Sequence, residues 1–351
     1  MSNKILHIGV DGSFTKSFIE LVKEEFDFDD HYFLITSDNN EKSIYSNVTL
    51  APRTIPSRLK HYAEATIRMH QARKIILHGL FDTKLVFILF LMPWLLKKSC
   101  WVLWGGDLYI YKQGEQNWRW RVAEFFRRPV IKGIQVITTT VPGDYELVKD
   151  CYGATGIYIQ NLMYQSHLYR KLDDIRRAEK KKDKIFVQIG NSSDPSNNHF
   201  EILDFISKKV DLPIEVFCPL AYGSNTHRND VIKKGKELLG ERFSPLTEVV
   251  SFDDYNRYMS SIDIAIFNHN RQQAMGNIIG LISLGKKVVL KSSVTPYKYF
   301  SDLGIKVYTL EDKDLFEPME SELVKMNVKK AKDYFTLERL KMNWKEVFDA
   351  K

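Results

Sequence analysis

The sequence predicts an α/β protein with two Rossmann-like, doubly wound domains that face a central cleft. The chain has 351 residues, more than one hydrophobic core usually serves. Its 44% hydrophobic and 27% charged residues are typical of a folded globular protein. Short apolar runs alternate with helix-length amphipathic segments, as in parallel βαβ units, and the alternation restarts after a polar stretch near the middle of the chain.

The first domain is expected at residues 1–165. Its strand-like runs are "ILHIGV", "YFLIT", "KIILHG", "CWVLWG" and "IQVITT". Helical segments separate them near residues 16–25, 56–72, 85–96 and 116–130. Strands joined through helices in this way are expected to run parallel in one sheet.

A linker is expected at residues 166–184, which are nearly all polar and end in a charge run. The second domain follows at residues 185–325. Its strand-like runs are "KIFVQIG", "IEVFCP", "TEVVSF", "IDIAIFN", "KKVVLK" and "IKVYTL". Residues 326–351 are predicted to form a C-terminal helix that crosses back to the first domain.

The formal net charge of +7 favours anionic partners such as nucleic acid, anionic membrane or phosphorylated ligands. Cys100, Cys151 and Cys218 are widely spaced, which is typical of buried thiols in a reducing cytosol. The N-terminus has no signal-peptide organisation, and no apolar run reaches transmembrane length. The sequence therefore predicts a cytoplasmic protein.

The longest apolar run, "LVFILFLMPWLL" at residues 85–96, has two interpretations. We favour a helix buried between a sheet and its neighbours. Alternatively, its face flanked by Lys84, Lys97 and Lys98 dips into the inner leaflet of a membrane. Basic residues at positions 119, 121, 127, 128 and 132, with Trp118 and Trp120 between them, would extend that surface, although such a pattern is more often a solvated helix face.

Function is expected in the loops that follow strands, because ligands of open α/β sheets bind at the carboxyl ends of the strands. The loop "IGNSSDPSNNH" at residues 189–199 is rich in Asn, Ser and Gly, which leave backbone N–H groups free to meet an anion. It is a candidate phosphate cradle, although any polar strand-to-helix turn looks similar. Asn198 and Glu201 resemble a capping box at the start of the next helix.

A second candidate loop lies within "FNHNRQQAMGNIIGLISLGKKVVL", residues 267–290. Here Arg271 precedes Gly276 and an apolar helix. A helix N-terminus beside an arginine suits a diphosphate, because the helix dipole, free N–H groups and a bidentate cation act together. Alternatively, Arg271 makes a surface ion pair and the glutamines merely begin a helix.

Three loops of the first domain occupy corresponding positions: "HGLFD" at 78–82, "WGGDLYIY" at 104–111 and "TTTVPGDY" at 138–145. Asp107 is the first candidate for a general base that accepts a proton from an acceptor hydroxyl, and His78 is the second. Alternatively, Asp107 caps a helix and His78 forms hydrogen bonds inside the core.

Several familiar signatures are missing. The chain has no GxGxxG and no GxxxxGK[ST] motif. The DxD patterns at residues 27–29 and 312–314 lie in polar connections, where we interpret them as chance. No set of His, Cys and carboxylate residues has the spacing of a metal site.

Six segments resemble, in order and approximate spacing, a bacterial family of glycosyltransferases: "HGLFD", "WVLWGGDLY", "IGNSSDPSNNH", "VFCPLAYG", "SFDDYNRYM" and "NRQQAMGNIIGLISLGKKVVL". The family is that of the dTDP-N-acetylfucosamine:lipid II N-acetylfucosaminyltransferases of enterobacterial common antigen synthesis, glycosyltransferase family 56. The resemblance covers roughly residues 75–300.

The resemblance implies the GT-B fold and transfer of 4-acetamido-4,6-dideoxygalactose from a dTDP donor. The implied acceptor is a polyprenyl-diphosphate-linked saccharide at the cytoplasmic face of the inner membrane, and no cofactor or metal is required. The implied donor-binding residues are Gly190, Asn191, Ser192, Ser193, Asn197, His199, Tyr222, Gly223, Arg271, Gln272, Gln273 and Gly276. The implied acceptor-side residues are His78, Asp82, Trp104, Gly105, Gly106, Asp107 and Tyr109.

Two alternatives stay open. A nucleotide-sugar epimerase or a phosphorylase has the same two-domain scaffold. A nucleic-acid or anionic-lipid binding module would use the +7 charge. Scattered basic residues and the lack of a recognised binding motif argue against nucleic acid.

Overall fold

The computed structural model describes residues 3–37, 43–52, 55–112, 116–171 and 183–350. The chain divides into two compact units. Unit 1 consists of Met1–Ser166 together with Leu337–Lys351, and unit 2 consists of His167–Thr336. Most of the expected linker, residues 172–182, lies outside the described residues.

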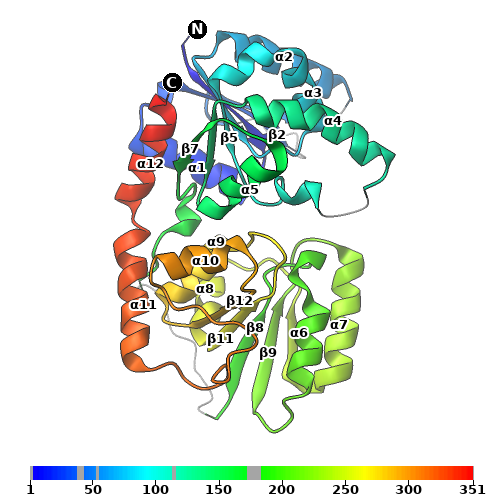
Figure 1. Cartoon of the computed structure of the whole chain (residues 1–351), viewed down its shortest axis with the longest axis vertical. Coiled ribbons are helices and arrows are strands. Elements are labelled where there is room, and N and C mark those ends of the chain that lie inside the picture. Colours follow the sequence, from blue (N-terminus) through cyan, green and yellow to red (C-terminus); the bar gives the residue numbers. More distant parts are fainter. Residues whose placement is uncertain (1–2, 38–42, 53–54, 113–115, 172–182, 351) are drawn as a thin grey trace. The chain divides into compact units, whose positions relative to one another are not determined.

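Unit 1 is built on a seven-stranded sheet in the order β3-β2-β1-β4-β5-β6-β7, in which each pair of neighbours is parallel (Figure 1). Its strands are β1 Ile5–Val10, β2 His31–Ser37, β3 Val48–Pro52, β4 Lys74–His78, β5 Ser99–Val102, β6 Val136–Thr139 and β7 Ile157–Gln160. Its helices are α1 Ser13–Glu25, α2 Ile55–Gln71, α3 Thr83–Leu91, α4 Trp118–Gly133, α5 Pro142–Tyr152 and α12 Leu337–Asp349.

The two faces of this sheet bury different residues. Leu6 and Ile8 of β1 belong to an aliphatic cluster with residues of α2, α3 and α4. His7 points to the opposite face, because successive side chains of a strand alternate. There it contacts Phe18 of α1 and Phe348 of α12, at ring-centroid distances of 5.3 and 5.9 Å.

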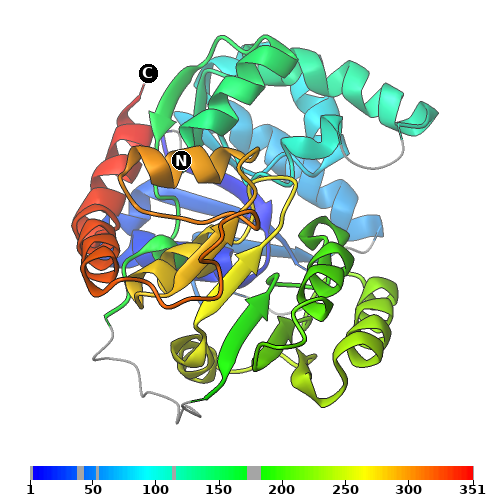
Figure 2. The ribbon, with the colours of Figure 1, turned by 60° about the horizontal axis from the view of Figure 1, so that its bottom comes forward.

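Unit 2 is built on a five-stranded parallel sheet in the order β10-β9-β8-β11-β12. Helices α6 and α7 cover one face and α9 and α10 the other (Figures 1 and 2). The strands are β8 Ile185–Ile189, β9 Ile214–Pro219, β10 Phe243–Leu246, β11 Ile264–Phe267 and β12 Lys287–Leu290. The helices are α6 His199–Ser207, α7 Asn225–Leu239, α8 Phe252–Ser261, α9 Met275–Ser283, α10 Thr295–Asp302 and α11 Ser321–Tyr334.

Short 3-10 helices complete the described secondary structure: η1 Phe28–Asp30, η2 Pro93–Lys98, η3 Tyr109–Tyr111, η4 Gln165–His167, η5 Pro195–Asn197 and η6 Gly240–Arg242. No helix within the described ranges is long and apolar enough to cross a membrane.

Two predicted strands of unit 2 are wrong. The edge strand is β10, Phe243–Leu246, and not the run at 247–252. Phe243 packs into the core, whereas Val249 is 82% exposed. The β-branched side chain of Val249 therefore has no core to pack against. The run at 305–310 contributes only an isolated bridge between Tyr308 and Val289. In unit 1, β3 and β7 are strands that the sequence patterns did not indicate.

The apolar run at 85–96 is not one buried helix. Helix α3 ends at Leu91, and Pro93 opens η2. Leu85, Val86 and Leu89 are buried, but Phe87, Leu91 and Trp94 are exposed. The basic residues at positions 119, 121, 127, 128 and 132 do not all lie on a solvated helix face, because the side chain of Arg127 is buried.

The predicted C-terminal helix is two helices, α11 in unit 2 and α12 in unit 1, separated at Phe335 and Thr336. Trp344 of α12 is fully buried, and its indole Nε1 donates a hydrogen bond to the carbonyl of Met163 at 2.8 Å. The amino group of Lys74 donates to the carbonyl of Val347 at 2.7 Å. These contacts tie the end of the chain to the sheet of unit 1.

Candidate active site

Three strand-to-helix turns of unit 2 lie next to one another. They follow β8, β9 and β11, which are neighbours in the sheet. Because these strands are parallel, their carboxyl ends meet at one edge, where open α/β sheets bind their ligands. The predicted donor-binding residues of the 189–199 loop, the "PLAYG" segment and the segment at 271–276 all lie in or beside these turns.

The turn after β8 is organised by Asn197, which is fully buried. Its Oδ1 accepts a hydrogen bond from the backbone N–H of Asn191 at 3.0 Å, and its Nδ2 donates to the hydroxyl of Ser192 at 3.3 Å. Gly190 has a φ of 64°, and a Cβ there would come within 2.6 Å of Asn197 Oδ1. Only glycine therefore fits this position of the turn.

Side chains connect the turns after β8 and β11. The amide Nε2 of Gln273 donates to Asn191 Oδ1 at 3.0 Å, and the Ser196 hydroxyl donates to Gln273 Oε1 at 2.7 Å. His269 Nε2 lies 2.9 Å from Asn197 Oδ1. The two turns therefore form one hydrogen-bonded network.

The turn after β9 belongs to the same hydrogen-bonded network. Asn191 Nδ2 donates to the Tyr222 hydroxyl at 2.8 Å, and the Ser193 hydroxyl donates to the Tyr222 carbonyl at 2.8 Å. Gly223 has a φ of 117°, and a Cβ there would lie 2.8 Å from the carbonyl carbon of Ser193. The Tyr222 ring is exposed beside this backbone contact.

Helices α6 and α9 both begin without a capping side chain. Their N-cap residues, Asn198 and Ala274, adopt left-handed backbone conformations with φ of 52° and 59°. The first N–H groups of each helix carry the positive end of its dipole. Two neighbouring turns therefore present helix N-termini that suit an anionic ligand.

The predicted capping box is wrong. Instead of capping α6, Asn198 Nδ2 donates to the carbonyl of Asn268 at 2.6 Å. Glu201 Oε2 accepts a hydrogen bond from Asn268 Nδ2 at 2.7 Å and lies 3.3 Å from Lys291 Nζ. Both side chains thus fasten α6 to the turn after β11, leaving the N-terminus of α6 open.

Arg271 lies four positions before the first residue of α9, with its side chain only 14% exposed. Its guanidinium lies 3.7 Å from the Asp194 carboxylate and donates to the carbonyl of Gln272 at 3.2 Å. Gln272 is buried, and Gly276 is the second residue of α9. An arginine is therefore positioned beside the open N-terminus of this helix.

Neutral imidazoles border this hydrogen-bonded network. Burial lowers the pKa of His199 to about 3, and burial together with the charge of Arg271 lowers the pKa of His269 to about 3. His199 Nδ1 lies 3.1 Å from His227 Nε2. At neutral pH these rings act as hydrogen-bonding groups, and Arg271 supplies positive charge.

Asp107 of unit 1, the first candidate for a general base, lies in the core as a hydrogen-bond acceptor. The residue is fully buried. Its Oδ2 accepts hydrogen bonds from the N–H of Leu80 at 2.9 Å and the indole of Trp101 at 2.7 Å. Its Oδ1 accepts from the N–H of Trp104 at 2.9 Å and that of Leu108 at 3.1 Å. Both oxygens are engaged, and neither reaches solvent to meet an acceptor hydroxyl.

His78, the second candidate for a base, also lies inside the core. His78 Nε2 lies 3.1 Å from His7 Nδ1, and His7 Nε2 lies 2.9 Å from His31 Nδ1. The Tyr164 hydroxyl lies 3.2 Å from His78 Nδ1. Burial lowers the pKa of His78 to about 3. The three imidazoles therefore form hydrogen bonds with one another beneath α1 and α12.

The other acceptor-side residues fall into two groups. Asp82 caps α3, accepting from the N–H of Lys84 at 2.9 Å, and Tyr109 donates its buried hydroxyl to Asp144 at 3.2 Å. Gly105 has a φ of 81°, and Gly106 is half-buried after it. Trp104 is half-buried among aromatic rings.

Trp104 forms an aromatic cluster at the carboxyl edge of the sheet in unit 1. Its ring centroid lies 5.9 Å from that of Phe14 and 6.1 Å from that of Phe81. Both phenylalanines are exposed. The turns after β1, β4 and β5 therefore share one aromatic surface.

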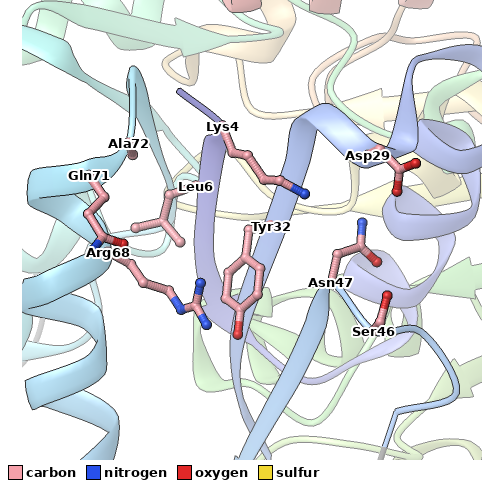
Figure 3. Close-up of a pocket in the computed structure, with 9 residues that line it drawn as sticks. All are labelled: Lys4, Leu6, Asp29, Tyr32, Ser46, Asn47, Arg68, Gln71 and Ala72. Atoms are coloured by element: carbon pink, nitrogen blue, oxygen red, sulfur yellow. The ribbon is translucent and has the colours of Figure 1, made fainter. Parts of the chain in front are cut away.

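The pocket in Figure 3 lies at the opposite edge of the sheet in unit 1, where β1 and β2 begin. It has a volume of about 230 Å³. Arg68 stacks on the Tyr32 ring at 3.5 Å and pairs with Glu64 at 2.8 Å. One of its cations, Arg68, is thus already paired, and the pocket lies at the edge of the sheet opposite to the turns that follow the strands.

Within the described part of the chain, no group of three or more His, Cys, Asp or Glu side chains could hold a metal ion. Sequence reasoning missed Ser196, His227 and His269, which bind the donor-side turns together. His269 had a usable signal, because it comes two residues after the end of β11.

Solved structures share this architecture. Sucrose-phosphate synthase from Thermosynechococcus elongatus is similar with a TM-score of 0.70 and 10% identity, covering 98% of each chain. HepE from Anabaena, in complex with UDP and glucose, has a TM-score of 0.68 and 10% identity over all of both chains. WaaG, a glycosyltransferase of lipopolysaccharide biosynthesis, has a TM-score of 0.64 and 10% identity, covering 99% of this chain and 100% of its own. These likenesses show the GT-B fold.

The family resemblance found in the sequence is confirmed over nearly the whole chain. A model described as 4-alpha-L-fucosyltransferase, glycosyl transferase group 56, matches residues 13–349. The chain therefore belongs to this family of glycosyltransferases.

Proposed function

We propose that the protein transfers 4-acetamido-4,6-dideoxygalactose from a dTDP donor to a polyprenyl-diphosphate-linked saccharide. The reaction belongs to the synthesis of a bacterial surface polysaccharide such as common antigen, O-antigen or capsule. The protein works as a peripheral protein at the cytoplasmic face of the inner membrane. One observation carries the donor side: three interlocked turns of unit 2 set two uncapped helix N-termini beside Arg271.

The donor diphosphate suits these turns. The helix N–H groups of α6 and α9 and the guanidinium of Arg271 supply hydrogen bonds and positive charge. In the transfer, an acceptor hydroxyl attacks the anomeric carbon, and the bond from that carbon to the phosphate oxygen breaks. The dTDP that leaves carries the developing negative charge, which the same groups stabilise without a metal.

The solved structures support a nucleotide-sugar donor. HepE, which has the same fold, is described in complex with UDP and with UDP-glucose. In the present chain the exposed ring of Tyr222 and the neighbouring amide of Asn191 lie at the same edge as the proposed diphosphate site. They are the groups that we assign to the nucleoside.

The acceptor side is proposed to be the aromatic surface of unit 1. The rings of Phe14, Phe81 and Trp104 suit a saccharide, whose apolar C–H faces pack on aromatic side chains. Since Asp107 and His78 are enclosed in the core, the proton of the acceptor hydroxyl goes to a group other than these two.

The donor assignment is tested by thermal unfolding with dTDP, UDP, GDP and ADP in the presence of EDTA. A ligand that binds only the folded state raises the unfolding midpoint. We expect the largest rise with dTDP. A larger rise with UDP or GDP would keep the glycosyltransferase and reject the dTDP sugar, whereas no rise with any of the four would reject the donor site.

The reaction is tested by following dTDP release from dTDP-4-acetamido-4,6-dideoxygalactose with and without lipid-linked acceptor. Transfer requires acceptor-dependent release and a labelled lipid product. Conversion of the donor sugar without acceptor would instead support an epimerase.

A further inference from the structure

Helices α3 and α4 pack side by side in unit 1 (Figure 1). Side chains of both helices line an open groove of about 590 Å³. We call it the α3–α4 groove. Most of its surface is apolar, and its lining includes Leu80, Val86, Phe87, Trp120, Ala123 and Phe126. This volume lies within the range of about 300–1,000 Å³ that is usual for small-molecule sites.

The floor of the groove is fixed by polar contacts below it. Buried Arg127 donates to the carbonyl of Leu80 at 2.5 Å and to that of Asp107, and lies 3.5 Å from the Glu124 carboxylate. On the wall, the Trp120 indole donates to the carbonyl of Ile110 at 2.9 Å. The groove is therefore preformed, and a ligand would not have to order it.

The rim combines exposed apolar side chains with cations. Phe87 of α3 is 43% exposed, and Val122 and Phe125 of α4 are exposed as well. Lys84 and Arg119 line the groove. The amino group of Lys84 lies 5.6 Å from the centre of the Tyr62 ring, and the guanidinium of Arg119 lies 5.5 Å from that of Trp118. An apolar groove with two cations in its lining matches a hydrocarbon chain that ends in an anionic group.

The groove also has a definite place relative to the turns of unit 1. Its lining includes Leu80 and Phe81, which follow β4 at its carboxyl end, and Phe81 contacts Trp104 of the aromatic surface. A ligand in the groove would thus have its anionic end beside the surface that we assign to the acceptor saccharide.

We propose that the α3–α4 groove binds the isoprenoid chain of the acceptor, with Lys84 and Arg119 at its diphosphate. This inference rests on the proposed function, because it assigns the lipid part of that acceptor. A flat bilayer would be met by the protruding rim alone. The concave, preformed lining fits a single chain better, so the groove is assigned to the chain.

The test measures binding of isopentenyl, geranyl and farnesyl diphosphate and of inorganic diphosphate to the full chain by calorimetry. If the isoprenoid enters the groove, the binding affinity should rise roughly tenfold for each added isoprene unit. This factor is expected when about two CH₂-sized groups of each isoprene unit are buried. Equal affinities across the series would overturn the proposal.

Ala123→Phe should fill the groove and weaken farnesyl diphosphate binding at least about tenfold, with the dTDP-induced rise in unfolding midpoint unchanged. Lys132→Phe is the matched control, since it adds the same ring on α4 outside the lining. Phe87→Asp, at a partly exposed wall position, provides a second variant if Ala123→Phe does not fold. Unchanged farnesyl diphosphate binding in folded forms of these variants would contradict the groove.

The double substitution Lys84→Gln and Arg119→Gln should weaken the binding of all prenyl diphosphates by a similar factor. Binding to vesicles of phosphatidylglycerol and phosphatidylethanolamine tests whether the protein contacts a bilayer instead. Vesicle binding without farnesyl diphosphate binding would show that this region contacts a bilayer surface and does not hold a single isoprenoid chain. Chain-length dependence without any dTDP effect would support the groove and reject the proposed donor.

Discussion

Replacing Asp107 by asparagine distinguishes a structural carboxylate from a catalytic one. Each carboxylate oxygen accepts two hydrogen bonds, from Leu80 and Trp101 on one side and from Trp104 and Leu108 on the other. An asparagine must turn its NH₂ group toward one of these pairs. In either orientation, two buried donors then face another donor and lose their acceptor.

The size of the effect follows from these contacts. A buried donor left without a partner costs about 1–3 kcal/mol, so two of them should lower the free energy of unfolding by about 4 kcal/mol. For a domain of 150–250 residues each kcal/mol shifts the unfolding midpoint by roughly 2–4 °C, which gives a fall of about 10 °C for unit 1.

The assay is thermal unfolding of Asp107→Asn, together with calorimetric titration of dTDP at a temperature where the variant is folded. Because the proposed donor site lies in unit 2, we expect dTDP affinity to be preserved. Asp82→Asn is the matched control, since asparagine caps a helix about as well as aspartate and should change the midpoint little. A variant of wild-type stability that has lost only turnover would refute our reasoning and restore Asp107 as a base.

Three further predictions concern the donor turns and the core. Arg271→Gln should weaken dTDP at least about tenfold in calorimetry, with Lys298→Gln on α10 as a control, because charged hydrogen bonds contribute about 1.5–3 kcal/mol; equal affinities would remove Arg271 from the site. Gly190→Ala should abolish the dTDP-induced rise in midpoint, since its Cβ would clash with Asn197; a normal rise would show that the turn tolerates a side chain. Burial lowers the pKa of His31 to about 4 and of His78 to about 3, so the unfolded chain binds protons first as the pH falls below about 6.5. Urea unfolding should therefore show stability falling between about pH 6.5 and 3, by up to about 1.4 kcal/mol per pH unit for each histidine, and a flat profile would contradict the buried neutral chain.

The order of strands and helices could be predicted because burial on both faces makes central parallel strands read as continuous apolar runs. β4 "KIILH" and β11 "IAIF" are of this kind. Edge strands lack that signal. β10 "FSPL" pairs on one side only, so its sequence is weakly constrained, and the more β-branched run "TEVVSF" beside it has the stronger strand pattern.

The candidate site was predictable in its place but not in its contacts. A polar loop after an apolar run places Asn191, Arg271 and Gln273 at the carboxyl edge from the sequence alone. Whether a carboxylate there faces solvent or the core depends on residues far along the chain. For Asp107 one such residue is Leu80, 27 positions away, whose backbone N–H donates to the carboxylate, and nothing in "WGGD" indicates this contact. The same holds for His78, whose partner His7 is 71 positions away.

Because unit 1 is completed by Leu337–Lys351, its two parts are separated in the chain by all of unit 2. During synthesis, unit 2 emerges before α12 does, so Trp344 reaches Met163 and Phe18 only afterwards. Until then, the face of the sheet that holds the imidazole chain lacks its α12 cover. The nascent protein therefore passes through a stage in which unit 2 has its whole sequence while unit 1 exposes apolar surface, and a chaperone that shields such surface would act at that stage.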